Sequence, residues 1–117
     1  MDAEIELIKK LIDILAKKDA TPEEKKVQAL IKSALLSENL FTFIKEVEFA
    51  LQGIGKVRAE TVKGVVDYAR AHNEAQIRII YGANERVETI IEEENNRLIQ
   101  AEIWVRGTLS YFGLLQD

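Results

Sequence analysis

Residues 77–112 read IRIIYGANERVETIIEEENNRLIQAEIWVRGTLSYF, and their apolar spacing decides the fold class. Positions seven residues apart form one series that is apolar except at its second member: Ile77, Asn84, Ile91, Leu98, Val105 and Phe112. This spacing keeps the series on one side of a helix. Opposite charges four residues apart, such as Glu102 and Arg106, favour helix on the outer side. The stretch therefore predicts helices and no sheet.

A break in this helical stretch is predicted at Gly82-Ala83-Asn84. Glycine is common just past the end of a helix, and asparagine is a good N-cap. We expect one helix from about Lys56 to Tyr81 and another from about Glu85 to Phe112, together forming a long C-terminal helical hairpin. The alternative is one continuous helix, in which Asn84 is a polar residue of the apolar seam that fixes register.

Three shorter helices are predicted upstream. Residues 2–18 place apolar side chains at helical spacing. Thr21-Pro22-Glu23-Glu24 predicts the start of a second helix, because threonine caps, proline suits the first turn and Glu24 can bond back to the cap. We expect Ser37 to cap a third helix over about residues 38–52. No segment alternates with period two. The chain, residues 1–117, is therefore expected to be one all-α domain, a four- to five-helix bundle.

Composition excludes several classes of protein. The chain has 117 residues, a net charge of −4, no cysteine and one histidine, His72. Disulfides, thiolate metal sites and sites that need two imidazoles are therefore excluded. No run of apolar residues is long enough to span a membrane, and the order of charges at the N-terminus is wrong for a secretory signal, so a cytoplasmic protein is expected. The composition rich in Ile, Glu and Lys suits a thermostable protein or a designed helical one.

One motif points to a specific chemistry. Residues 51–62 follow the pattern Leu51-x-Gly53-Ile54-Gly55-x-x-x-Ala59-x-x-Val62. This pattern resembles the helix-hairpin-helix motif of DNA-binding proteins; the resemblance covers residues 49–66 only, within a helix-hairpin-helix-like element at about residues 40–66. It implies two helices that pack against each other, with Ile54 between them, and a turn that binds DNA phosphates without reading base sequence. Gln52 departs from the motif, which commonly has proline there.

The physical chemistry of the turn agrees with that resemblance. Glycines permit positive φ, and amides at the start of a helix attract anions. We therefore expect the hairpin amides of residues 53–57 to hold a phosphate, with three basic side chains adding positive charge. The candidate nucleic-acid-binding residues are Gly53, Ile54, Gly55, Lys56, Val57, Arg58 and Lys63. The alternative is a plain connection between helices whose basic side chains are only solvated.

Other residues give weaker indications of a functional site. Aromatic and polar residues of the last two predicted helices could line a small-molecule pocket or an interface: Gln76, Tyr81, Ile91, Leu98 and Trp104. The run Glu92-Glu93-Glu94 is interpreted as a solvated acidic face, because consecutive side chains of a helix diverge. No nucleophile stands beside His72, so no catalytic residue, metal or cofactor is assigned, and the sequence gives no positive support for an enzyme.

The leading hypothesis from sequence is a non-enzymatic protein that binds the nucleic-acid backbone through the turn at residues 53–57. One alternative is a helical interaction protein that self-associates as a homo-oligomer or binds a partner through its C-terminal helices. The other is a helical bundle with a small-molecule pocket. No membrane partner is expected, because acidic residues accompany the lysines of the first amphipathic segment.

Overall fold

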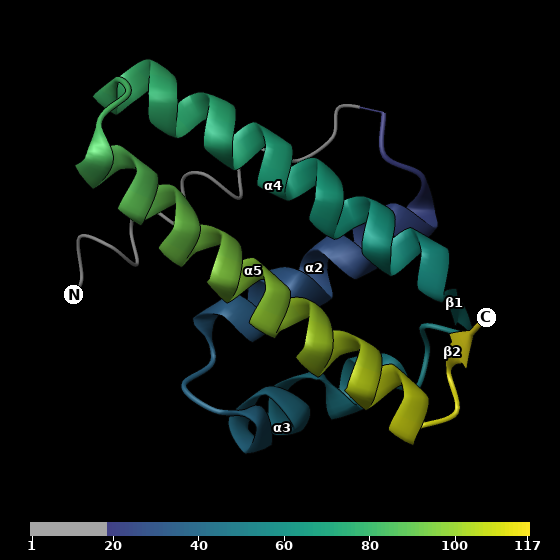
Figure 1. The fold of residues 1–117 in the computed structure, drawn as a ribbon. Helices are drawn as coiled ribbons and strands as arrows, with labels where there is room; N and C mark the ends of the chain where they lie inside the picture. The colour runs from purple at the N-terminus through teal and green to yellow at the C-terminus, as the bar shows by residue number, and fades with distance from the viewer. Residues whose placement is uncertain (1–18) are drawn as a thin grey trace.

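The computed structural model describes residues 19–117, so the helix predicted at residues 2–18 lies outside the described part. Four helices are present in this part: α2 (Pro22–Leu36), α3 (Leu40–Leu51), α4 (Ala59–Tyr81) and α5 (Glu85–Tyr111) (Figure 1). Two strands of two residues each, β1 (Val57–Arg58) and β2 (Leu115–Gln116), complete the described chain. The predicted all-α class is confirmed.

Two helix starts follow the local signals in the sequence. At the start of α2, the Thr21 hydroxyl accepts a hydrogen bond from the Glu24 amide and the Glu24 carboxylate accepts one from the Thr21 amide. At the start of α5, Asn84 Oδ1 accepts a hydrogen bond of 3.1 Å from the Val87 amide. Gly82 follows α4 with φ of +83°. Residues 59–111 therefore form two helices, and Asn84 is a cap and not a seam residue.

Two other starts differ from prediction. Helix α3 begins at Leu40 because Asn39, and not Ser37, is the cap: Asn39 Oδ1 accepts a 2.8 Å hydrogen bond from the Thr42 amide. The Ser37 hydroxyl instead donates to the Ser33 carbonyl. Helix α4 begins at Ala59, later than predicted, because the residues before it are extended and form β1.

The expectation of no sheet is wrong in one place. Strands β1 and β2 pair in parallel, with Val57 opposite Leu115 and Arg58 opposite Gln116. The Val57 amide also donates a 2.7 Å hydrogen bond to the Leu114 carbonyl. Strands of two residues are too short to produce an alternating pattern, and their partners lie far apart in the sequence. This pair fastens the C-terminus beside the start of α4 (Figure 1).

Helices α4 and α5 run antiparallel side by side, and α2 packs across both of them (Figure 1). The main core lies where α2, α3 and the adjoining halves of α4 and α5 meet, and Phe43, Val66, Leu98 and Leu109 are at its centre. A smaller core of Ile77, Val87 and Ile91 lies nearer the turn between α4 and α5. No described helix combines the length and the apolar character needed to cross a membrane.

Candidate functional site

Few backbone amides of the turn between α3 and β1 are free to bind an anion. The amides of Gly53, Ile54 and Val57 donate to the carbonyls of Ala50, Leu51 and Leu114. The amides of Gly55 and Lys56 have no hydrogen-bond acceptor among the described residues, and both residues are exposed. Gly55 has φ of +75°, a conformation that L side chains rarely adopt. Two of the five predicted phosphate-binding amides therefore remain accessible.

A carboxylate of the same chain already lies at the start of α4. Arg58, the cap residue of α4, makes no side-chain capping bond. Instead, Glu23 Oε1 accepts hydrogen bonds from the Arg58 amide at 3.1 Å, from Arg58 Nε at 3.3 Å and from the Thr61 hydroxyl. The Thr61 hydroxyl, with the Arg58 amide and guanidinium, holds the pKa of Glu23 below its ordinary value. Glu23 thus occupies the helix N-terminus beside the predicted phosphate site.

The basic residues of the turn are only partly available to an anion. Arg58 pairs with Glu23, and Lys63 lies 3.6 Å from Asp67. Lys56 is exposed and makes no ion pair within residues 19–117. Lys26, which sequence analysis did not select, donates from Nζ to the Ile54 carbonyl at 2.9 Å. Helix α2 therefore contacts this region with charges of both signs: Glu23 pairs with Arg58, and Lys26 adds a positive charge at Ile54.

The helices on either side of the turn pack mainly against other elements. Helix α4 packs chiefly against α5 and α2, and α3 packs chiefly against α2. Ile54 is half-buried against the main core. The Gly-Ile-Gly sequence thus connects two helices that are held by other elements.

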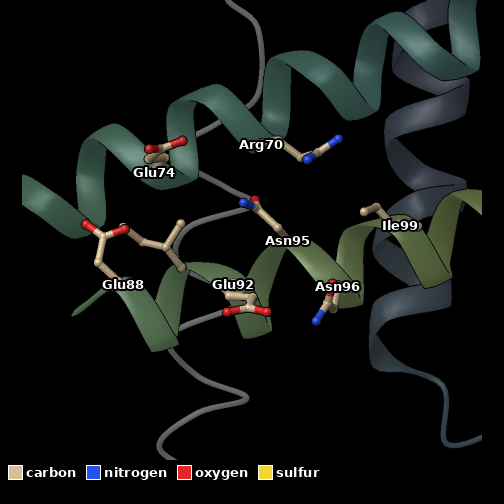
Figure 2. Close-up of a pocket in the computed structure, with 8 residues that line it drawn as sticks. Arg70, Glu74, Glu88, Glu92, Asn95, Asn96 and Ile99 are labelled. Atoms are coloured by element: carbon tan, nitrogen blue, oxygen red, sulfur yellow. The ribbon is translucent and has the colours of Figure 1, made fainter. Parts of the chain in front are cut away.

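A groove of about 390 Å³ separates α4 from α5 (Figure 2). Eight residues line it: Arg70, Glu74, Glu88, Ile91, Glu92, Asn95, Asn96 and Ile99. Two shielded polar atoms, Arg70 Nε and Asn95 Oδ1, have no hydrogen-bond partner among residues 19–117. Asn73, which is 4% exposed, also has an unpartnered Oδ1. These polar residues separate the main core from the smaller one.

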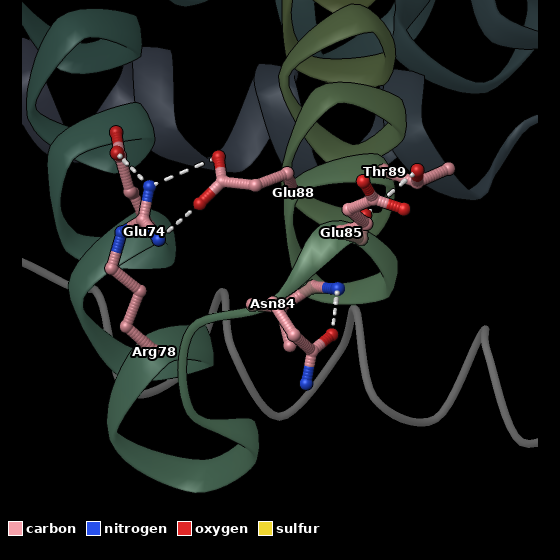
Figure 3. Close-up of polar contacts among 7 residues, drawn as sticks. Glu74, Arg78, Asn84, Glu85, Glu88 and Thr89 are labelled. Atoms are coloured by element: carbon pink, nitrogen blue, oxygen red, sulfur yellow. Dashed lines mark hydrogen bonds and ion pairs between the residues drawn. The ribbon is translucent and has the colours of Figure 1, made fainter.

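An ion-pair cluster closes one end of this groove (Figure 3). Arg78 lies 3.0 Å from the Glu74 carboxylate and also donates from both terminal nitrogens to Glu88 on the facing helix. The hydrogen bonds from Arg78 lower the pKa of Glu88, and those to Glu88 and Glu74 raise the pKa of Arg78. The cluster ties α4 to α5 near their connection, so two of the groove's three carboxylates are already engaged.

The residues predicted for a pocket or interface are not brought together. Ile91 lines the groove, whereas Leu98 is buried in the main core. Trp104 stacks on Phe43 at 6.3 Å between ring centroids. Tyr81 is exposed at the end of α4, and Gln76 is half-buried on the same helix. Leu98 is 2% exposed in the main core, and Ile91, at 5%, is reached only through the groove, whereas Phe112 at the end of the seven-residue series is exposed.

Large apolar side chains are exposed in several places: Ile79, Ile80 and Tyr81 at the end of α4, Ile103 on α5, and a further set on α3 and at the end of α5. Phe41, Phe49 and Tyr111 are 70%, 84% and 82% exposed. Tyr111 contacts Phe112 edge to face at 5.2 Å. A shallow groove of about 280 Å³ joins the end of α3 to the last turn of α5, and is lined by Glu48, Leu51, Gln52, Phe112 and Leu114. We call the exposed side of α3 with Tyr111 and Phe112 the aromatic surface.

Sequence analysis did not select Phe41, Phe49 or Glu23. Helical spacing in LFTFIKEVEFAL separates the buried Phe43 and Val47 from the exposed Phe41 and Phe49, but it gives no function for the exposed rings. Glu23 belongs to the Thr21-Pro22-Glu23-Glu24 helix start, and this local role gives no reason to expect a contact with α4.

No group of three or more His, Cys, Asp or Glu side chains in the described part is arranged to hold a metal ion. Comparisons with protein-family models, with curated proteins and with solved structures found no match to the chain. The site is therefore interpreted from its own geometry alone.

Proposed function

We propose that this chain is a helical interaction protein that binds another protein through its aromatic surface. The observation that supports this function most directly is the exposure of Phe41, Phe49 and Tyr111, each more than two-thirds accessible to water. Leaving a large apolar side chain exposed forgoes about 1.5–3 kcal/mol of burial free energy. Clusters of exposed apolar residues commonly mark binding surfaces, and aromatic residues are frequent anchors there.

The rigidity of the scaffold supports the same function. Directly beneath the exposed aromatic residues, Phe43 and Val47 anchor α3 in the main core. Leu114 and Leu115 pack against that core as well, and β2 pairs with β1, so the turn that follows Tyr111 is fixed at both ends. A partner would therefore meet a preformed surface and would not have to order it, which lowers the entropic cost of binding.

Size-exclusion chromatography of the tagged protein in lysate from its native cells tests this proposal. The parent should elute in a complex larger than the 13.3 kDa chain. Phe49→Glu should shift it toward the free chain, because a charge would have to be desolvated within the interface. Ala71→Glu, an exposed change on α4, is the matched control and should leave the complex intact. Elution of the parent as a free chain would overturn the proposal.

Binding of the nucleic-acid backbone is a second candidate function, supported by the open amides of Gly55 and Lys56. A phosphate there would accept both hydrogen bonds and meet the exposed Lys56 ammonium. Fluorescence anisotropy with labelled duplex and single-stranded DNA at low and physiological salt tests it. Salt-sensitive binding that Gly55→Asp abolishes in a folded variant would support this function, and no binding at low salt would exclude it.

For the whole chain we propose a four- to five-helix bundle in which α4 and α5 form the long C-terminal hairpin. We further propose a cytoplasmic, thermostable protein, because the composition is free of cysteine and rich in Ile, Glu and Lys.

A further inference from the structure

The outer side of α3 has a regular order of side chains. Phe41, Lys45, Glu48 and Gln52 are separated by four, three and four residues, and all four are exposed. This is the spacing by which paired helices contact each other in coiled coils. On the opposite side of the same helix, Phe43, Val47 and Leu51 are buried in the core. The four-residue row is therefore an exposed side of α3, and its Glu48 and Gln52 border the shallow groove beside Phe112.

We propose that this row is the contact by which two copies of the chain form an antiparallel, two-fold symmetric dimer. The proposal rests on the function proposed above and names the partner as a second copy of this chain. The row has the same spacing when read in either direction. In an antiparallel pair, Lys45 therefore lies opposite the partner subunit's Glu48, and Glu48 opposite the partner subunit's Lys45. One symmetric contact thus places two opposite-charge pairs together.

The charges select this orientation over the parallel one. A parallel pair would place lysine against lysine and glutamate against glutamate, which disfavours it. In the single chain, neither Lys45 nor Glu48 forms an ion pair with any residue in the described range. The Lys45 ammonium lies 5.4 Å from the centroid of the Phe41 ring, so the basic and aromatic parts of the row form one contiguous surface. Pairing two copies gives both charges partners that one copy does not provide.

The size of the surface fits a dimer that includes more than α3. A helix of 12 residues is about 18 Å long, and a stable interface usually buries about 1,200 Å² or more in total. Glu48 and Gln52 line the shallow groove with Phe112, so a second α3 laid on the row also reaches the last turn of α5. The exposed ring of Phe49, next to Glu48 in the sequence, and that of Phe112, which borders the groove, supply further apolar area.

Sedimentation equilibrium of the purified chain, with charge-reversal variants, tests the dimer. The parent should become dimeric as its concentration is raised to about 0.5 mM, where an interface of ordinary size is occupied. Lys45→Glu and Glu48→Lys should each raise the dimer dissociation constant about tenfold, because two attractive pairs become repulsive. The double variant exchanges the two charges and should restore the parent's affinity. Glu60→Lys, an exposed change on α4, is the control and should have no effect.

The outcomes separate the two proposals. A monomeric parent at every concentration would overturn the dimer. A dimer that is indifferent to either reversal, or that the double variant fails to restore, would overturn the antiparallel row. If the chain is monomeric alone but enters a Phe49-dependent complex with a different protein, the interaction function stands and the second copy is rejected. Circular dichroism confirms that each variant folds, and all the substituted side chains are exposed.

Discussion

Glu23 of α2 should stabilise the fold by capping the start of α4. Substitution of Glu23 tests how much this contact contributes to stability. Glu23→Ala removes one acceptor from the Arg58 amide, which acts as a helix cap bond and is expected to contribute about 1 kcal/mol. It also removes the hydrogen bond from the Thr61 hydroxyl to a charged acceptor, which contributes about 1.5 kcal/mol. The pair with the Arg58 guanidinium adds little, because that side chain is 60% exposed.

Summing these contributions, the free energy of unfolding of Glu23→Ala should fall by roughly 2–3 kcal/mol, measured by urea denaturation with circular dichroism at neutral pH. Thr61→Val alone should lower the free energy of unfolding by part of this amount. The double variant should lower it by less than the sum of the two single losses, because both substitutions remove the same hydrogen bond. Glu60→Gln is the matched control, because Glu60 lies in the first turn of α4 but makes none of those bonds. Its free energy of unfolding should fall by less than that of Glu23→Ala. Additive losses, or a Glu23→Ala protein as stable as the parent, would refute the reasoning.

The same contact should depend on pH. The pKa of Glu23 is lowered in the folded chain from its ordinary value of 4.5. The stabilisation by the ionised carboxylate is therefore complete above about pH 4.5 and is lost as the pH falls through the lower, folded-state pKa. The stability difference between the parent and Glu23→Gln should accordingly shrink in acid. A difference that stays constant from neutral pH to strong acid would show that the charge of Glu23 plays no part.

Three further predictions concern the scaffold. Asn84→Ala should lower the free energy of unfolding by about 1 kcal/mol in urea denaturation, because α5 loses its cap; an unchanged midpoint would contradict the capping role. Phe43→Ala should cost about 3–5 kcal/mol, since Phe43 is fully buried, and should shift Trp104 emission to longer wavelength, because the ring that stacks on it is gone. Arg78→Met should return the pKa of Glu88 toward its ordinary value, which carboxyl NMR titration measures; an unmoved titration would deny the ion pair in solution.

Local signals in the sequence predicted the helices well. The Thr21-Pro22-Glu23-Glu24 start and the Gly82–Asn84 break act within one turn of chain, so their consequences can be read from neighbouring residues. The seven-residue series predicted one side of a helix, with Ile91 and Leu98 as candidates for a pocket or interface, and Ile91, Leu98 and Val105 are buried.

Contacts between distant segments could not be predicted in this way. The bond between Glu23 and Thr61 joins residues 38 positions apart, and β1 pairs with residues at the other end of the described chain. These contacts decide which amides of the turn stay available, and the local motif alone does not show them. The aromatic surface escaped prediction for a related reason: the exposure of Phe49 depends on which side of α3 the other helices cover.

Photo-crosslinking from the aromatic surface tests the central claim most directly. A photoreactive phenylalanine analogue would replace Phe49 in one protein and Ala71, on α4, in another, and both would be irradiated in lysate from the native cells and as purified chains. The proposed function predicts a defined adduct with a protein from position 49 and none from position 71. If the purified chain gives an adduct of twice its own mass, the partner is a second copy. Absence of any adduct from position 49 under both conditions would contradict the account.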